Sequence, residues 1–377
     1  MAAVEDVTGA PLQAALPKEH YVDPAAFAVE RERVLTKEWT CAGRVDDLGL
    51  LEPASVVILE IHGESVVVAR TPEGRLAGHY NVCRHRGSQL FPVEPGGCPQ
   101  PAQPARAIRC PYHSWTYDLD GRLLRAPHTE GVPDFEPEAF GLHPVGVATW
   151  GGFLFVRLDP ADPSTLDDGL ADVSTRLARY PLDALRVGWR RTYDLAANWK
   201  LVCENYNECY HCAGVHPELC RLVPAFARGG QDLEWENGIP HRDGAWTFTT
   251  NGTSTRAPFP DLDEAERVRH KGELIYPNLL LSLSAEHVAA FVLTPLRHDR
   301  CRIEFLLLFA ADEVDKPDFD PGDAAELWHL VNGQDWAICE SVQRGMSSRA
   351  YRSGWFAPME DESLDIRRWL LPRLDAT

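Results

Sequence analysis

CRHRG (residues 83–87) and CPYHSW (residues 110–115) are the two stretches that decide the fold of this chain. Each joins one cysteine to one histidine at short range. Zinc sites built from two cysteines and two histidines usually group like residues together and carry the second pair on a helix. Mixed pairs on two loops favour a [2Fe–2S] centre, because each loop then reaches both irons, with zinc as the alternative. The four candidate ligands are Cys83, His85, Cys110 and His113.

The sequence around these stretches has the pattern of a small all-β domain. Short apolar runs such as SVVILEI (55–61) and GGFLFVRL (151–158) are separated by Gly, Pro and Asp turns. We expect this domain to span residues 40–158. It follows an N-terminal segment, residues 1–39, in which residues 24–39 have the spacing of an amphipathic helix that packs on the larger domain.

A second domain is expected over residues 159–377, after the Asp- and Pro-rich stretch LDPADPSTLDDG (158–169). Runs of strands with helices set apart predict an α+β domain, in which helices flank a central antiparallel sheet. Helices are expected at 170–180 and 322–345, besides a helical segment around residues 208–216. The expected strands are residues 186–195, 244–250, 279–285, 288–296 and 301–309.

A candidate metal site begins in NWKLVCENYNECYHCAGVHPEL (residues 198–219), where His211 and His216 are five residues apart. In a regular helix a five-residue step rotates by roughly 500°, which would put the two rings on different faces. Gly214 and Pro217 are expected to break the helix and let both imidazoles turn toward one ion.

A carboxylate for the same ion is expected from the long C-terminal helix. Asp335 falls on a predicted apolar stripe, where an ionised carboxylate is costly unless a cation or strong donors meet it. Two histidines and one carboxylate form the usual site of non-haem Fe(II). The alternative is an Asp335 that pairs with an arginine or caps the backbone. The stripe consists of Leu327, Val331, Ile338 and Val342.

Composition excludes several classes of protein. Among the 377 residues, 37 basic and 56 acidic side chains give a formal charge of −19, which would repel a nucleic-acid backbone. No apolar run reaches the roughly 20 residues that cross a bilayer, and the N-terminal sequence lacks a leader pattern. We therefore expect a soluble cytoplasmic protein without nucleic-acid or membrane partners. Its cysteines are expected to be reduced, including the Cys209/Cys212 pair, which is interpreted as packing.

Both constellations together resemble the catalytic α subunit of Rieske non-haem iron oxygenases, the ring-hydroxylating dioxygenase superfamily. Its cluster motif is C-x-H-R-G followed by C-P-x-H-G-W. The resemblance covers most of the chain, through NGQDWAICESVQRG (332–345). Two departures are visible. Ser114 replaces the usual glycine, and the spacer between the loops is longer, with the insertion placed in PVEPGGCPQPAQPA (92–105).

The resemblance implies a role for each matching residue. The two Cys/His pairs would hold the Rieske cluster, shielded by Trp115, and Asn205 would lie near the mononuclear iron. Glu208 would link a cluster histidine of one subunit to an iron-binding histidine of its neighbour. Most family members have aspartate there, so the glutamate is a departure. The implied Fe(II) ligands are His211, His216 and Asp335.

The resemblance also implies partners and a reaction. No Gly-rich dinucleotide-binding fingerprint occurs in this chain. The NAD(P)H-dependent reductase that would supply electrons from NADH is therefore expected to be a separate protein. The electrons would pass from the cluster to the Fe(II) of the adjacent subunit in a homotrimer, where O2 would be used to hydroxylate a small molecule.

The substrate is expected to be a quaternary ammonium compound such as carnitine, glycine betaine or choline. ENYNECYHCAGVHPEL (204–219) and IYPNLLLSLSAEHV (275–288) are most similar to family members that oxidise such compounds next to nitrogen and cleave the C–N bond. The alternatives are an aromatic ring hydroxylase or O-demethylase and, outside enzymes, a Rieske electron-transfer protein. An aromatic cage would suit a cation. Its candidate members are Trp235, Trp246, Phe248, Phe259, Tyr276 and Phe291.

Overall fold

The structure is a computed structural model that describes residues 11–94, 99–161, 163–229, 233 and 235–376. The chain forms two compact units. The smaller unit runs from Leu35 to Ala171, and the larger one combines the N-terminal segment up to Val34 with the chain from Asp172 onward.

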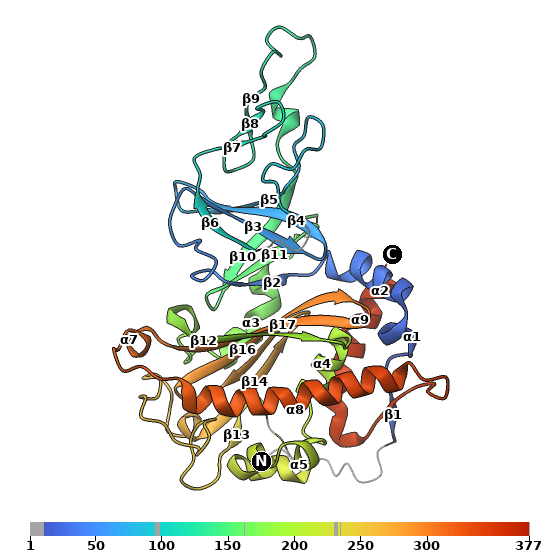
Figure 1. The fold of residues 1–377 in the computed structure, drawn as a ribbon, viewed down its shortest axis with the longest axis vertical. Coiled ribbons are helices and arrows are strands. Elements are labelled where there is room, and N and C mark those ends of the chain that lie inside the picture. Colours follow the sequence, from blue (N-terminus) through green and yellow to red (C-terminus); the bar gives the residue numbers. More distant parts are fainter. Residues whose placement is uncertain (1–10, 95–98, 162, 230–232, 234, 377) are drawn as a thin grey trace. The chain divides into compact units, whose positions relative to one another are not determined.

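The smaller unit is all-β, as the sequence predicts. Its seven-stranded antiparallel sheet has the order β2-β11-β10-β5-β4-β3-β6, and a three-stranded sheet has the order β7-β8-β9 (Figure 1). The strands are β2 (Thr40–Arg44), β3 (Ser55–Ile61), β4 (Glu64–Arg70), β5 (Leu76–Tyr80), β6 (Gln100–Pro104), β7 (Ile108–Arg109), β8 (Thr116–Tyr117), β9 (Leu123–Arg125), β10 (Pro144–Trp150) and β11 (Phe153–Arg157).

Local sequence explains the hairpin at the centre of this sheet. β3 and β4 are apolar and β-branched, and they pair from Ser55 opposite Arg70 to Ile61 opposite Glu64. The two residues between them, His62 and Gly63, both have positive φ, as a tight two-residue hairpin turn requires. The register of the hairpin is therefore fixed by its turn.

The long spacer between the two Cys/His loops contributes a strand of its own. β6 pairs with β3 at the edge of the seven-stranded sheet. Proline is tolerated at an edge because the missing N–H faces no partner strand. Residues 95–98 of the spacer lie outside the described part of the chain.

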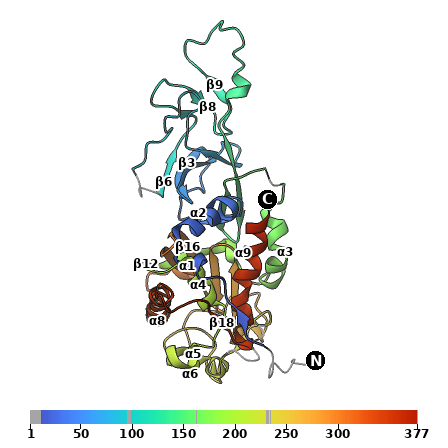
Figure 2. The ribbon, with the colours of Figure 1, turned by 90° about the vertical axis from the view of Figure 1, so that its right-hand side faces the viewer.

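The larger unit contains a six-stranded antiparallel sheet of order β12-β17-β16-β15-β14-β13. The expected α+β architecture, with helices flanking a central antiparallel sheet, is confirmed (Figures 1 and 2). A separate pair, β1 (Gln13–Ala14) and β18 (Trp355–Phe356), joins the two ends of the chain. The strands of the main sheet are β12 (Leu185–Leu195), β13 (Ile239–Pro240), β14 (Arg269–Ile275), β15 (Leu279–Leu283), β16 (His287–Arg297) and β17 (Arg300–Ala310).

The strand expected at residues 244–250 was wrong, and β14 was missed. Residues 241–256 form turns, because Asn251 accepts from Thr249 and Thr253 and so competes with strand pairing. β14 (RHKGELI) lacks an apolar alternation. Its charges are paired locally instead, Lys271 with Glu266 at 2.8 Å.

The helices of the larger unit include a long one and several short ones. The helix expected at 322–345 is α8, and the one expected at 24–39 ends at Glu30, followed by one π-turn (Arg31–Leu35). No helix in the described ranges is both long and apolar enough to cross a membrane. The α-helices are α1 (Glu19–Val22), α2 (Pro24–Glu30), α4 (Trp199–Tyr206), α5 (Cys212–Val215), α6 (Pro217–Leu222), α7 (Ala311–Val314), α8 (Gly322–Met346) and α9 (Asp365–Asp375). A further helix, α3 (Leu166–Arg176), spans the division between the units.

The buried face of α8 differs in part from the predicted stripe. Ile338 and Val342 are 38% and 39% exposed, whereas Cys339 and Gln343 are buried. The reason is that α4 packs along this part of α8, and Gln343 accepts from the backbone N–H of Asn198 at the start of α4. The half of α8 that carries Trp328 and Val331 is buried as an apolar stripe should be.

The N-terminal segment is joined to α4 by a buried ion pair. Lys200 in α4 is fully buried, and its Nζ lies 2.7 Å from Oε2 of Glu30, which is also buried. Burial lowers the pKa of Lys200, and the Glu30 carboxylate opposes that shift. Next to this pair, the Tyr21 hydroxyl donates to the buried Glu204 carboxylate.

We expect Glu30→Leu to lower the free energy of unfolding by about 3–5 kcal/mol, because it leaves a buried ammonium without its partner. The double variant Glu30→Leu/Lys200→Met, which removes both charges, should be more stable than Glu30→Leu alone. Urea unfolding followed by circular dichroism measures the free energy of unfolding of the double variant and of both single variants. A double variant as unstable as the sum of the two single variants would show that the pair is not coupled.

Candidate active site

The two Cys/His loops of the smaller unit bring like ligands together. One loop follows β5 and the other connects β7 to β8. Nδ1 of His85 lies 3.2 Å from Nδ1 of His113. The thiol of Cys110 lies next to the thiol of Cys83. Burial is the main cause that raises the pKa of Cys83, and the thiol of Cys110 raises it further. The cysteines are buried, whereas His85 is exposed. The pairs are thus mixed along the chain but sorted in space, which is the donor arrangement that fits a [2Fe–2S] cluster with one sulfur-held and one imidazole-held iron.

Two residues of the second loop shape this site. Ser114 has a φ of +60°, a left-handed conformation that glycine adopts without strain, so its β-carbon is accommodated at some cost. Its hydroxyl accepts from Arg109 at 2.8 Å. Trp115 is buried and stacks on His85, with a 7° interplanar angle and 4.9 Å between centroids.

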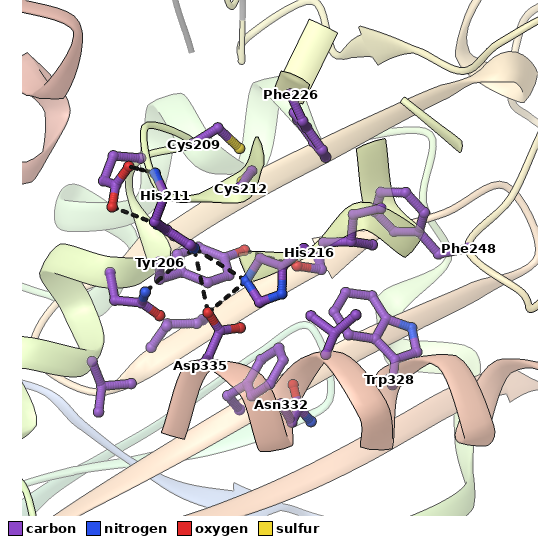
Figure 3. Close-up of a pocket in the computed structure, with 18 of the residues that line it drawn as sticks. Tyr206, Cys209, His211, Cys212, His216, Phe226, Phe248, Trp328, Asn332 and Asp335 are labelled. Atoms are coloured by element: carbon purple, nitrogen blue, oxygen red, sulfur yellow. Dashed lines mark hydrogen bonds and ion pairs between the residues drawn. The ribbon is translucent and has the colours of Figure 1, made fainter. Parts of the chain in front are cut away.

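In the larger unit, three donor atoms converge as expected from the sequence. Nε2 of His211 lies 3.2 Å from Nε2 of His216, and Oδ1 of Asp335 lies 3.3 Å from the first and 2.8 Å from the second (Figure 3). Ligands about 2.1 Å from a metal and at right angles are about 3.0 Å apart. These residues are the one such group of histidines, cysteines and carboxylates within the described part of the chain.

The other ring nitrogens fix the orientation of both imidazoles. Nδ1 of His211 lies 2.5 Å from Oε1 of Glu208, and Nδ1 of His216 lies 2.7 Å from Oε1 of Gln334. Each Nδ1 is therefore the ring nitrogen that donates to a neighbouring oxygen, and each Nε2 is the ring nitrogen that faces the carboxylate of Asp335. Three potential ligand atoms that face one point fit a bound cation.

Charges around the triad act in the same direction. Burial lowers the pKa of His211, but the carboxylates of Asp335 and Glu208 outweigh it and raise the pKa to about 10. Burial raises the pKa of Asp335, but the hydrogen bonds from His211 and His216 lower it overall. A site that stabilises positive charge so strongly is suited to a metal cation.

The expected helix break lies at His216 rather than at Gly214. α5 continues through Gly214, and the chain departs from helical geometry at His216, where φ is −121° and ψ is 64°. Pro217 then begins α6. The residue before a proline avoids the helical region, so Pro217 accounts for the break, and the part of the prediction that involved Gly214 was wrong.

Glu208 and Asn205 both lie next to His211. The second oxygen of Glu208 accepts from the backbone N–H groups of Tyr210 and His211, so its carboxylate is held from both sides. Nδ2 of Asn205 lies 3.4 Å from Nε2 of His211. Cys209 and Cys212 are buried free thiols beside this loop.

A cavity opens beside the triad, and its walls are largely aromatic. Among the expected cage residues, Trp235, Phe248 and Phe291 line it. Trp246, Phe259 and Tyr276 do not, which was an error of the prediction. The lining rings that the sequence did not indicate are Tyr206, Phe226, Trp328 and Trp336.

One of these rings is held by a buried polar chain. Nε1 of Trp328 donates to Nε2 of His287 at 3.0 Å, and Nδ1 of His287 donates to the carboxylate of Glu286. Arg256 then binds the other oxygen of Glu286 at 3.1 Å. In the sequence, the adjacent Glu286 and His287 of SAEHV are the feature that could have indicated this chain of hydrogen bonds. Their connection to Trp328 is a tertiary contact, which the sequence does not show.

Comparison with protein families agrees with both units. Residues 38–136 match the Rieske [2Fe-2S] domain, and residues 182–376 match the catalytic domain of the ring hydroxylating alpha subunit. The chain therefore belongs to the Rieske non-haem iron oxygenases, and it is an oxygenase subunit rather than a simple electron carrier. The Rieske match also favours the iron–sulfur interpretation of the Cys/His loops over zinc.

Individual relatives are monooxygenase subunits. The glycine betaine monooxygenase oxygenase subunit of Chromohalobacter salexigens is 32% identical, over 100% of this chain and 91% of its own length. The carnitine monooxygenase oxygenase subunit of Escherichia coli K12 is 29% identical, over 89% of this chain and 85% of its own.

Solved structures share the fold. A quaternary ammonium Rieske monooxygenase superposes with a TM-score of 0.75 at 24% identity, covering 98% of this chain and 97% of the other. Naphthalene 1,2-dioxygenase from Rhodococcus sp. gives 0.71 at 20% identity, covering 99% and 97%. At such identities the likeness concerns the fold, and it does not discriminate between ammonium and aromatic substrates.

Proposed function

We propose that this chain hydroxylates a quaternary ammonium compound at a carbon next to nitrogen, so that the C–N bond is cleaved. The observation that carries the proposal is the cavity, in which aromatic rings surround the space beside the His211, His216 and Asp335 triad. The similarity to other chains supports it, since the relatives include glycine betaine, carnitine and choline monooxygenases.

The ligand roles are part of this proposal. Cys83 and Cys110 would hold one iron of the Rieske cluster, and His85 and His113 the other. The triad would hold a single Fe(II). When bound, the cluster supplies electrons singly and the Fe(II) supplies a site for O2. The electron source would be an NAD(P)H-dependent reductase that oxidises NADH.

The residues around the triad have distinct tasks. The rings of the cavity attract a cation through their π faces and exclude water, while Glu208 and Gln334 keep the two imidazoles in the tautomer that leaves Nε2 free. Hydroxylation next to the cationic nitrogen gives a product whose hydroxyl proton leaves as the C–N electron pair returns to nitrogen. An aldehyde and an amine are released.

The domain limits and the assembly are proposed as well. Residues 1–39 would be a helical segment on the catalytic domain, 40–158 the Rieske domain and 159–377 the catalytic domain. Glu208 would accept a hydrogen bond from His113 of an adjacent copy in a homotrimer. It would thereby link that histidine to the triad, because it already contacts His211. The inter-subunit electron transfer described for a quaternary ammonium Rieske monooxygenase of the same fold supports this.

The test is O2 consumption with a surrogate reductase across carnitine, glycine betaine, choline and a panel of neutral aromatics. Cation–π attraction of about 0.5–2 kcal/mol per ring would favour a cation over a neutral isostere by tenfold or more. We expect aldehyde formation in step with O2 uptake for at least one ammonium compound. Product formed with the aromatics alone would establish the ring hydroxylase or O-demethylase instead.

A further inference from the structure

Three side chains of the cavity wall have a buried polar atom without a hydrogen-bond partner among the described residues: His270, Asn332 and Trp336. His270, in β14, lines the cavity and is 4% exposed. Its Nδ1 is completely buried without a hydrogen-bond partner among the described residues. Leaving such a group unpaired is unfavourable, so a buried imidazole at a cavity wall points to a ligand that hydrogen-bonds it.

The surroundings of His270 keep its ring neutral. Burial, followed by the neighbouring His241 and His287, lowers the pKa of His270 well below its ordinary value. A neutral imidazole offers one N–H and one lone pair, which match a hydroxyl group. It supplies no positive charge to balance a carboxylate.

The rest of the wall offers an anion neutral N–H donors, from Asn332 and Trp336, but no cationic partner. Glu208 and Asp335 line the cavity, and the described lining residues include neither lysine nor arginine. A carboxylate brought into this space would lose its hydration without gaining a cationic partner, which is a large penalty in a partly buried site.

His270 lies at the Phe248 side of the cavity. The rings of these two residues are 4.1 Å apart between centroids. Figure 3 shows Phe248 on the far side of His216 from His211. A substrate with its N-methyl groups at the triad would therefore direct its other end toward the ring of His270.

We propose that His270 determines specificity by hydrogen-bonding an uncharged polar end of the substrate. The cavity then favours a quaternary ammonium alcohol over a quaternary ammonium carboxylate. This inference rests on the proposed function, because it presumes that a cationic nitrogen occupies the aromatic walls. It adds the recognition of the opposite end of the molecule.

The experiment measures binding to the metal-loaded protein by calorimetry with four probes. These are choline, glycine betaine, tetramethylammonium and 3,3-dimethylbutan-1-ol, the neutral carbon analogue of choline. We expect choline to bind at least about tenfold more tightly than glycine betaine, and the neutral analogue to bind weakly. His270→Phe, which keeps a ring in place, should weaken choline about tenfold and leave tetramethylammonium unchanged.

The matched control is His241→Phe. His241 packs on the same Phe248, at 5.1 Å, but does not line the cavity. We expect this variant to bind choline as the unaltered protein does, and we expect His270→Gln, which restores a hydrogen-bonding group, to recover part of the affinity lost in His270→Phe.

Two results would overturn the inference alone: glycine betaine binding at least as tightly as choline, or His270→Phe weakening tetramethylammonium as much as choline. In both cases the proposed function would stand, since ammonium compounds still bind. If the neutral analogue binds as well as choline, or if no ammonium compound binds, the proposed function falls together with the inference.

Discussion

Asp335→Ala should abolish turnover while leaving the visible spectrum of the Rieske cluster intact. The reason is that the triad then loses its carboxylate, which lies within 3.3 Å of both imidazole Nε2 atoms, whereas the Cys/His loops belong to the other unit. Removing one of three ligands should release the mononuclear iron, because the remaining histidines no longer close the site.

The experiment compares iron content, the cluster spectrum and product formation in Asp335→Ala and in Glu326→Ala. Glu326 is an exposed acid of α8 and serves as the matched control, for which we expect normal turnover. If Asp335→Ala loses its cluster absorbance without unfolding, or turns over normally, the assignment of the triad is wrong.

Glu208→Gln should retain both kinds of metal and slow turnover by about 10–100-fold or more. The amide oxygen can still accept from the backbone N–H groups that bind Glu208. However, glutamine has one acceptor oxygen where glutamate has two. It therefore cannot accept hydrogen bonds both from Nδ1 of His211 and from the histidine of an adjacent subunit. It also removes the negative charge that stabilises a protonated ring.

Single-turnover kinetics locate this defect. A reduced Glu208→Gln protein mixed with O2 and substrate should reoxidise its cluster slowly, and Glu208→Asp, which has the residue usual in the family, should recover part of the rate. Reoxidation at the normal rate in Glu208→Gln would remove this side chain from the path of electrons.

The features that could be predicted from the sequence are those determined by short segments. The hairpin from β3 to β4 follows from alternation and a two-residue turn, and the Cys/His loops follow from spacing. The contact of Asp335 with His216 spans 119 residues, yet it was predicted because an acid on the apolar part of a helix requires a cation.

The features that were missed depend on tertiary contacts that leave no local pattern. Gln334 orients His216 from the far helix, and a polar residue on a helix surface gives no indication of this role. Trp328 and Phe259 are equally apolar in sequence, but Trp328 lines the cavity, whereas Phe259 packs on Tyr180. The prediction of the aromatic cage was therefore correct for three of its six candidate residues.

Local hydrogen bonding explains the errors in secondary structure. The side chain of Asn251 stabilises turns where β-branched and aromatic residues suggested a strand. In β14 the polar residues are accommodated because Lys271 and Glu273 each find an ion-pair partner. Apolar periodicity does not report such pairs.

The central claim is that one chain holds both an iron–sulfur cluster and a separate mononuclear iron. The most direct test is the determination of iron, acid-labile sulfide and zinc in the purified protein, together with the electron paramagnetic resonance spectrum after reduction. We predict about three irons and about two sulfides per chain, with the low average g value of a cluster that has two imidazole ligands. Stoichiometric zinc without sulfide would contradict the account.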